Sequence, residues 1–295
     1  MTASRRAPSS LLLQQRVAAL RRKLPGARNG DVHSVHQARV ATRRLREALP
    51  LIRAGKAGRR LERVARELTG VLGTVRELDV ALEMVGGLAG TDGVSRAAVT
   101  CLHQAIANER QALQRDSARR LDEYDMERLE RKVLRALERN GDRQADAVDR
   151  QAQVSAVRRR AARRAARLEA AMDSAGAIYL PERLHQVRIA IKKLRYALEI
   201  ARDLSGSRAE ARIRTLQRMQ DLLGRMHDLE VLIARTRGLQ AATVRDLQLS
   251  SDLDQLVRVL ETDARRLHGH YLAQRRALIE LCTRVMAAAE PRKAA

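Results

Sequence analysis

Two short runs of basic side chains, each headed by a histidine, stand out as residues able to do chemistry. Residues 35–49 read VHQARVATRRLREAL, and residues 184–198 read LHQVRIAIKKLRYAL. On a helix, spacings of three and four residues gather His36, Arg39 and Arg43 on one side, away from the apolar stripe. Guanidinium and ammonium donors in such a row suit the oxygens of successive phosphates, so we interpret the runs as a polyanion-binding site. The first ladder is His36, Arg39, Arg43, Arg44 and Arg46, and the second ladder is His185, Arg188, Lys192, Lys193 and Arg195.

Each ladder places like charges side by side, which destabilises an isolated helix by about 0.2–0.5 kcal/mol per pair. A single basic run is usually a solvated helix face, and a single histidine near a helix start usually caps or packs. Recurrence of the whole ladder with its histidine in register favours a bound polyanion instead. Because the neighbours of His36 and His185 are cations, which repel divalent ions, we expect neither a metal nor a cofactor.

Further basic residues line the helices expected next to the ladders. On the helix after each ladder, arginines share a face with Gly73 or Gly224, and these glycines are expected to permit close helix approach. Glu77 and Asp228 are expected to anchor neighbouring arginines, although simple pairing within one helix explains them equally well. Additional phosphate contacts are predicted at Arg59, Arg63, Arg66, Arg160, Arg163, Arg164, Arg167, Arg214, Arg218 and His227.

The overall composition indicates a folded, strongly basic protein without aromatic core residues. Lys and Arg number 58 against 35 Asp and Glu, which leaves a formal charge of +23 at pH 7. Hydrophobic residues make up 45% of the 295 residues, but there is no Phe or Trp and there are four Tyr. A core of Leu, Val, Ala and Ile suits amphipathic helices better than strands, which favour aromatic and β-branched residues. We therefore predict an all-α protein with an acidic partner.

Turn signals such as Pro25-Gly26, Asn29-Gly30 and Ser205-Gly206 divide the chain into about nine helices. The stretch 240–251 is expected to be a loop or a broken helix. The predicted helices lie near residues 9–24, 32–54, 57–85, 94–116, 119–139, 143–175, 181–204, 208–239 and 252–288.

An internal repeat relates the two halves of the sequence. Residues 35–49 align without gaps on residues 184–198, at an offset of 149 residues. Downstream, LGTVRELDVAL at residues 72–82 matches LGRMHDLEVLI at an offset of 151 residues, and a weaker match follows in the same order. Three matches in one order indicate duplication. We predict two similar helical bundles, 1–140 and 141–295, related by a pseudo-twofold axis.

The remaining features favour a cytoplasmic location. Cys101 and Cys282 lie far apart, so they suggest neither a disulfide framework nor a thiolate zinc site. The first residues contain only three consecutive leucines, too few for the apolar region of a signal peptide. Apolar runs of about 18 uncharged residues do not occur in the sequence, so we expect no membrane span.

The repeated HxxRVxxRRLR-like helix and the LGxx[RH][DE]L[DE] segments resemble the CHAD family, named for its conserved histidine α-helical domain. The resemblance implies two four-helix bundles around a basic channel, binding of inorganic polyphosphate and association with polyphosphate granules. Some positions depart from the family pattern: Arg76-Glu77 and His227-Asp228 stand where Arg-Asp is usual, and Lys192 and Lys193 replace arginines. An ExExK motif of a triphosphate-tunnel domain is not found, so the chain is interpreted as a stand-alone module.

Three classes of function suit a basic helical chain to different degrees. Non-catalytic binding of polyphosphate through the ladders is preferred, and non-specific nucleic-acid binding is the alternative, because the same charge attracts any phosphate backbone. The scarcity of aromatic side chains disfavours single-stranded nucleic acid, whose bases stack on such side chains. A phosphoryl-transfer enzyme is disfavoured because the sequence shows neither a phosphate loop nor a clear acidic cluster for Mg²⁺, and Asp79 and Glu230 stand isolated from other acids.

Overall fold

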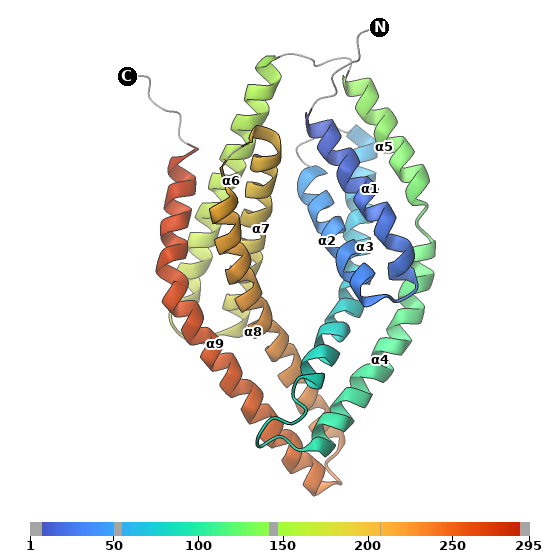
Figure 1. Ribbon diagram of the computed structural model, residues 1–295, viewed down its shortest axis with the longest axis vertical. Coiled ribbons are helices and arrows are strands. Elements are labelled where there is room, and N and C mark those ends of the chain that lie inside the picture. The colour runs from blue at the N-terminus through green and yellow to red at the C-terminus, as the bar shows by residue number, and fades with distance from the viewer. Residues whose placement is uncertain (1–7, 50–54, 142–146, 207, 290–295) are drawn as a thin grey trace. The chain divides into compact units, whose positions relative to one another are not determined.

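The structure is a computed structural model that describes residues 8–49, 55–141, 147–206 and 208–289. Within these ranges the chain forms nine helices and no strand, which confirms the all-α prediction (Figure 1). The helices are α1 (Pro8–Arg28), α2 (Val32–Ala48), α3 (Gly55–Gly86), α4 (Arg96–Asp122), α5 (Met126–Gly141), α6 (Ala147–Ala175), α7 (Pro181–Ser205), α8 (Glu210–Ala242) and α9 (Leu247–Ala287).

The helices that carry the ladders begin at strong local signals. Gly30 adopts a φ of +78°, which favours glycine, and ends the turn after α1. Asp31 then caps α2, because its carboxylate accepts a hydrogen bond of 2.7 Å from the backbone N–H of Ser34. Gly176 has a φ of +62° after α6, and Pro181 occupies the first position of α7, where a missing N–H costs nothing.

Several helix ends differ from the prediction, among them the starts of α5 and α9, which begin at Met126 and Leu247 instead of near residues 119 and 252. The break predicted at Pro25-Gly26 is wrong, because α1 continues through Pro25 to Arg28 and the Pro25 carbonyl still accepts a hydrogen bond of 3.2 Å from the Asn29 N–H. The break predicted after residue 116 is absent, since α4 continues to Asp122. The stretch 240–251 contains a short turn, after which Asp246 caps α9 through the Leu249 N–H at 3.0 Å.

By spatial compactness the chain divides into two units whose segments alternate along the sequence. Four of the five boundaries between these segments fall inside α3, α4, α6 and α7, and the fifth falls just before α8. The predicted halves, 1–140 and 141–295, rest on the sequence repeat. These halves, the duplication, the pseudo-twofold axis and the channel all stay predictions. Unit 1 takes the described residues of Met1–Arg76, Gln111–Arg159 and Glu199–Arg208, and unit 2 takes those of Glu77–Arg110, Arg160–Leu198 and Ala209–Ala295.

The core of unit 1 is aliphatic and joins α1, α2 and α3, with α1 packed along α2 and also touching α5. The predicted apolar stripe of α2 is confirmed at Ala38, Ala41, Leu45 and Leu49, all of which are buried. Ile52, predicted to extend that stripe, lies outside the described residues. Other core residues of this unit are Leu13, Val17, Leu20, Leu24, Leu61, Leu68, Leu72 and Leu121.

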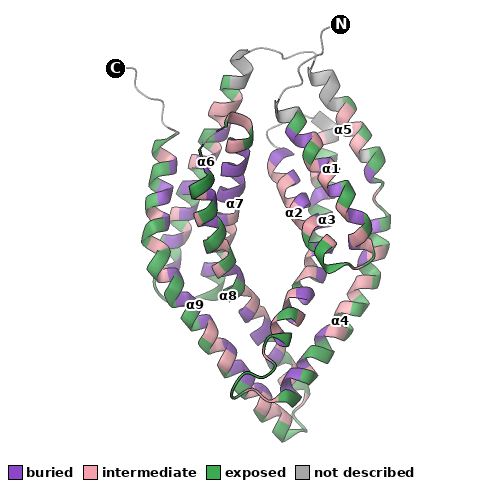
Figure 2. Cartoon of the chain, in the orientation of Figure 1, coloured by how far each residue is buried: buried purple, intermediate pink, exposed green. Residues whose placement is uncertain are grey.

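The core of unit 2 is built mainly from α7, α8 and α9, with α8 and α9 lying along each other (Figure 1). Buried and exposed positions alternate around these helices, as amphipathic helices require (Figure 2). Tyr271 of α9 is the largest of the fully buried side chains in the described part of the chain. In α7 the apolar face uses Val187, Leu194 and Leu198, whereas Ala190 is only half-buried.

Asp79 of α3 forms a buried ion pair in unit 2. The Nε of Arg110 lies 2.7 Å from the Asp79 carboxylate, whose side chain is 1% exposed, against 22% for Arg110. The second carboxylate oxygen of Asp79 is buried without a hydrogen bond. Removing one partner of such a pair leaves a charge in a poorly hydrated place.

We expect Asp79→Ala to lower the free energy of unfolding by about 3–5 kcal/mol, because Arg110 would lose its buried counter-charge. Urea denaturation followed by circular dichroism measures this loss. Asp254→Ala is the matched control, since Asp254 pairs with Arg258 at 2.7 Å on an exposed face and should cost about 0–1 kcal/mol. Equal losses in the two variants would contradict a stabilising role for the buried pair.

Candidate anion-binding site

The first ladder lies on α2, in unit 1. Burial of Val35, Ala38 and Leu45 fixes one face of α2 against the core, and the basic side chains therefore occupy the other faces. His36 is exposed, and Arg39 and Arg43 are half-buried. The cation spacing predicted from the sequence is thus present on a helix whose orientation is set by apolar packing.

Arg76 of α3 is a member of this cluster that the sequence-based site omitted. Burial lowers the pKa of His36, and the next largest contribution comes from the positive charge of Arg76, ahead of Arg39, His33 and Arg43. Arg76 was detectable, because at the offset of 151 residues it corresponds to His227, which was included.

The second ladder lies on α7, in unit 2, and faces α8. The ring of His185 lies 4.5 Å, centroid to centroid, from the ring of His227. One turn further, the Arg188 guanidinium lies beside Gly224, and Asp228 acts on it electrostatically. Burial lowers the pKa of Arg188, and the Asp228 charge opposes that change. The structure therefore brings together His185, Arg188, His227 and Asp228.

The local charges keep His185 in its neutral form near pH 7. Burial lowers the pKa of His185, and the positive charges of Arg188 and Lys192 lower it further, whereas Glu182 opposes them. Its Nδ1 atom is buried and makes no hydrogen bond. An anion brought to this side of α7 would face two cations and an imidazole that is able to accept a proton.

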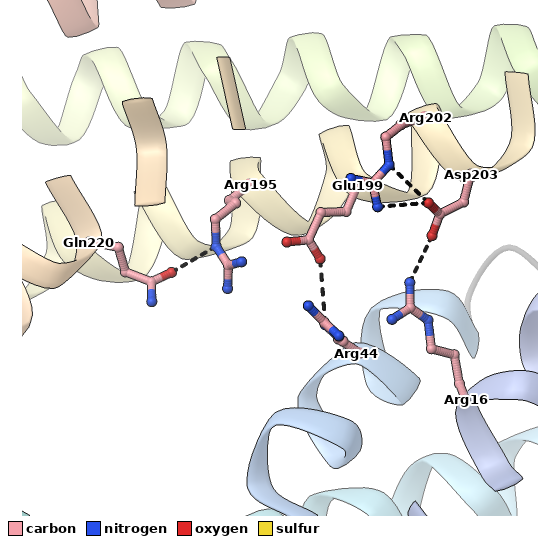
Figure 3. Close-up of polar contacts among 7 residues, drawn as sticks. All are labelled: Arg16, Arg44, Arg195, Glu199, Arg202, Asp203 and Gln220. Carbon is pink, nitrogen blue, oxygen red and sulfur yellow. Dashed lines mark hydrogen bonds and ion pairs between the residues drawn. The ribbon is translucent and has the colours of Figure 1, made fainter. Parts of the chain in front are cut away.

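Two ladder residues are held by other side chains (Figure 3). In unit 1, the Nε of Arg44 lies 3.7 Å from the carboxylate of Glu199, which is 7% exposed. In unit 2, the Nε of Arg195 donates to the amide oxygen of Gln220 at 3.0 Å, and its guanidinium carbon lies 4.6 Å from the centroid of the Tyr196 ring. Arg195 is only 9% exposed. Their geometry suits fixing the helix as much as binding an anion.

Sequence reasoning missed the carboxylates that hold Arg44 and its neighbour Arg16. The latter donates to Asp203 at 2.8 Å, and Asp203 also accepts from Arg202 at 2.9 Å (Figure 3). Burial makes the largest contribution to lowering the pKa of Arg16, and the positive charge of Arg44 lowers it further. The negative charge of Asp203 raises it. Glu199 and Asp203 lie more than 150 positions along the sequence from Arg44 and Arg16, and no local sequence pattern predicts such a pairing.

The additional basic residues are more dispersed than the ladders. On α3, Arg63 and Arg66 pair with glutamates of their own helix, at 4.0 Å from Glu67 and 2.9 Å from Glu62. Exposed positions are found for Arg59, Arg63, Arg66, Arg163, Arg167, Arg214 and Arg218, and half-buried ones for Arg46, Arg160, Arg164, Lys193 and His227.

The prediction that two glycines permit close helix approach was wrong at Gly73. A Cβ atom added there would meet nothing within 4 Å. At Gly224 the nearest neighbour of such an atom is the Nε of Arg188, at 3.7 Å, which is a side chain and not the backbone of another helix. The glycine in the second copy therefore lies against the ladder, whereas the one in the first copy has open space beside it.

The supporting carboxylate Glu77 pairs with an arginine outside the predicted site. Arg235 of α8 lies 3.6 Å from Glu77 and also pairs with Glu109 of α4. The recurring acids Asp79 and Glu230 are both engaged, the first by Arg110 and the second by the hydroxyl of Tyr179. In the described part of the chain, no group of three or more His, Cys, Asp or Glu is placed to hold a metal ion, and no helix is long and apolar enough to cross a membrane.

We expect Gly73→Ala to raise the free energy of unfolding by about 0.5–1 kcal/mol, because alanine favours the helix and its methyl group has open space. Urea denaturation measures the change. Gly26→Ala serves as the contrast, since a Cβ there would lie 2.3 Å from the Ser34 hydroxyl oxygen and should destabilise the fold. A loss of stability in Gly73→Ala would show that another helix does approach this position.

Comparison with known proteins places this arrangement in a family. The family description of the CHAD domain matches residues 11–237. The crystal structure of the CHAD domain from the plant Ricinus communis is similar, with 23% identity, a TM-score of 0.58 and coverage of 98% of this chain and 93% of that chain. PptA from Streptomyces chartreusis shares 16% identity and a TM-score of 0.61, covering 96% of this chain and 97% of its own. No match is found among curated proteins. Because the family match spans α1 to most of α8 and includes both ladders, the chain belongs to the CHAD family.

Proposed function

We propose that this protein binds inorganic polyphosphate, or a polyanion of the same chemistry, through its two ladders and without catalysis. The observation that carries the proposal is the same in both copies. The imidazole that heads each ladder is influenced from the next helix by a second basic side chain. The positive charge of Arg76 acts on His36, and the ring of His227 lies against that of His185. Basic side chains from two neighbouring helices are thereby gathered at the head of each ladder.

The ligand chemistry follows from what the ladders offer. Arg39, Arg43, Arg188 and Lys192 provide charged N–H donors at intervals along a helix, and the charge of +23 attracts any polyanion. Binding would release counterions, as it does for other linear phosphate polymers. The few tyrosines offer little surface for stacking bases, so the phosphates themselves are the groups recognised.

The absence of catalysis is part of the proposal. Phosphoryl transfer depends on carboxylates that hold Mg²⁺ near the phosphates. The two acids that recur in register, Asp79 and Glu230, are engaged by Arg110 and Tyr179. We infer that they stabilise the helices. In the cell, a protein with this function would accompany polyphosphate granules in the cytoplasm.

Polyphosphate should bind more tightly than nucleic acid at equal phosphate concentration, because it carries denser charge and no bulky bases. Competition of labelled long-chain polyphosphate with duplex DNA and with RNA, at fixed salt, measures this order. Affinity should also fall steeply with salt, as the release of counterions requires. Displacement by DNA or RNA at lower phosphate concentration would favour non-specific nucleic-acid binding instead.

Removing the central residues of either ladder should weaken binding of long polyphosphate. We expect the pair Arg39→Ala and Arg43→Ala, or the pair Arg188→Ala and Lys192→Ala, to cost about 1–3 kcal/mol, a several-fold to hundredfold loss, through lost charge-assisted contacts. Isothermal titration calorimetry measures the affinities. Helicity should stay unchanged, since these side chains lie off the buried stripe.

The matched control removes two exposed arginines of α9, Arg276 and Arg284, and should change affinity little beyond the general loss of charge. Combining both ladder pairs tests whether one polymer contacts both ladders, because linked contacts give penalties that are not additive. If a folded variant with all four ladder changes binds with wild-type affinity, the ladders are ordinary solvated helix faces and not the binding site.

A further inference from the structure

The two ladders differ at one position in the groups that face them. In the first copy the positive charge of Arg76 acts on His36, and the equivalent of Arg76 in the second copy is His227, whose ring lies against that of His185. A guanidinium stays charged at every pH in the working range, whereas an imidazole gains or loses its charge near neutrality. At these two positions the second ladder therefore has two titratable rings, whereas the first has one ring and a permanent charge. His33 is a further imidazole that acts on His36 in the first copy.

The geometry of the second copy places these two rings in direct contact. Their centroids lie 4.5 Å apart with the planes tilted by 45°. The Nδ1 atom of His185 is buried and makes no hydrogen bond. Two rings this close cannot both gain a proton without mutual repulsion, so they titrate as a coupled pair.

The charges around the pair come from the two helices that carry it. On α7, Arg188 and Lys192 oppose a positive charge on His185, and Glu182 favours it. On α8, Asp228 acts on Arg188. Two further groups on α8 and α9 are engaged by Tyr179. Glu230 accepts a hydrogen bond from the Tyr179 hydroxyl, and the ring of His268 packs against the Tyr179 ring. Two cations and two acids therefore lie around the pair, and at His185 the effects of Arg188 and Lys192 exceed that of Glu182.

We propose that phosphate binding at the second ladder is linked to proton uptake by the His185–His227 pair, so that polyphosphate is held more tightly as the pH falls. This inference rests on the proposed function and adds a pH response to one of its two ladders. The first ladder, in which Arg76 is always charged, would provide the part of the affinity that depends less on pH.

The sign follows from the charges already described. In the free protein, burial and the neighbouring cations hold the pKa of His185 below its usual value, so the ring is neutral at pH 7. Phosphate oxygens beside Arg188 and Lys192 would offset those positive charges and favour the protonated ring. Binding then takes up protons, and by linkage a lower pH tightens binding, up to tenfold per pH unit for each whole proton taken up.

The test is calorimetric titration of long-chain polyphosphate at pH 6.5 in two buffers that differ in ionisation enthalpy, which gives the number of protons taken up. His227→Arg copies the first ladder and should take up fewer protons than the wild type. It should also bind at pH 8 at least as tightly and show a flatter dependence of affinity on pH. Arg76→His makes the opposite change and should take up more protons. His103→Arg, at an exposed position of α4, is the control and should match the wild type.

Circular dichroism checks that each variant is folded, and NMR titration of the imidazole signals, with and without tripolyphosphate, gives a second measurement. The signals of His185 should move to a higher apparent pKa when tripolyphosphate is present. If the wild type binds polyphosphate and folded His227→Arg takes up the same number of protons as the wild type, this inference is overturned and the proposed function stays intact. If neither polyphosphate nor tripolyphosphate binds at any pH, the proposed function fails, and the inference fails with it.

Discussion

The requirement that most constrains this fold is that rows of like charge must sit on helices whose only strong attachment is an aliphatic face. Without phenylalanine or tryptophan, the helices depend on leucine, valine and alanine for contact, and each such residue buries a modest area. The faces must therefore be long and continuous. That need explains helices such as α8 and α9, which run 33 and 41 residues and pack along each other. It also explains why the ladder helix α2 is held on one side by a fully buried stripe.

The protein distributes its positive charge between two uses. Some arginines are engaged by carboxylates that lie far away in the sequence, as Arg110 is by Asp79 and Arg44 is by Glu199. These pairs join helices and offset part of the positive charge. The central ladder residues also lie near other basic groups. Arg39 and Arg43 both act on His36, and Arg188 lies near the acid Asp228. The distinction between the two groups is made by tertiary structure and not by residue type.

Much of the fold could be predicted because its causes are local. Helical periodicity, the Asp31 cap and the Gly30 turn act within a few residues of one another, and the repeat alone is enough to align His36 with His185. The predictions were wrong where the local structure depends on residues distant in the sequence, or where one local effect outweighs another. Pro25 is tolerated inside α1 because the following turn still closes, and Gly73 borders open space that no sequence pattern reveals. The pairing of Glu77 with Arg235 was out of reach for the same reason, since the two lie on different helices.

The contact between Arg195 and Tyr196 gives the second ladder a spectroscopic property of its own. Because the chain has no tryptophan, tyrosine emission is not lost by energy transfer to an indole, and only four phenols contribute to it. One of them, Tyr196, is buried with a ladder guanidinium over its ring at 4.6 Å. Any movement of that guanidinium changes the electric field at the ring, so the ultraviolet absorption and emission of the unlabelled protein carry a signal from within the ladder itself.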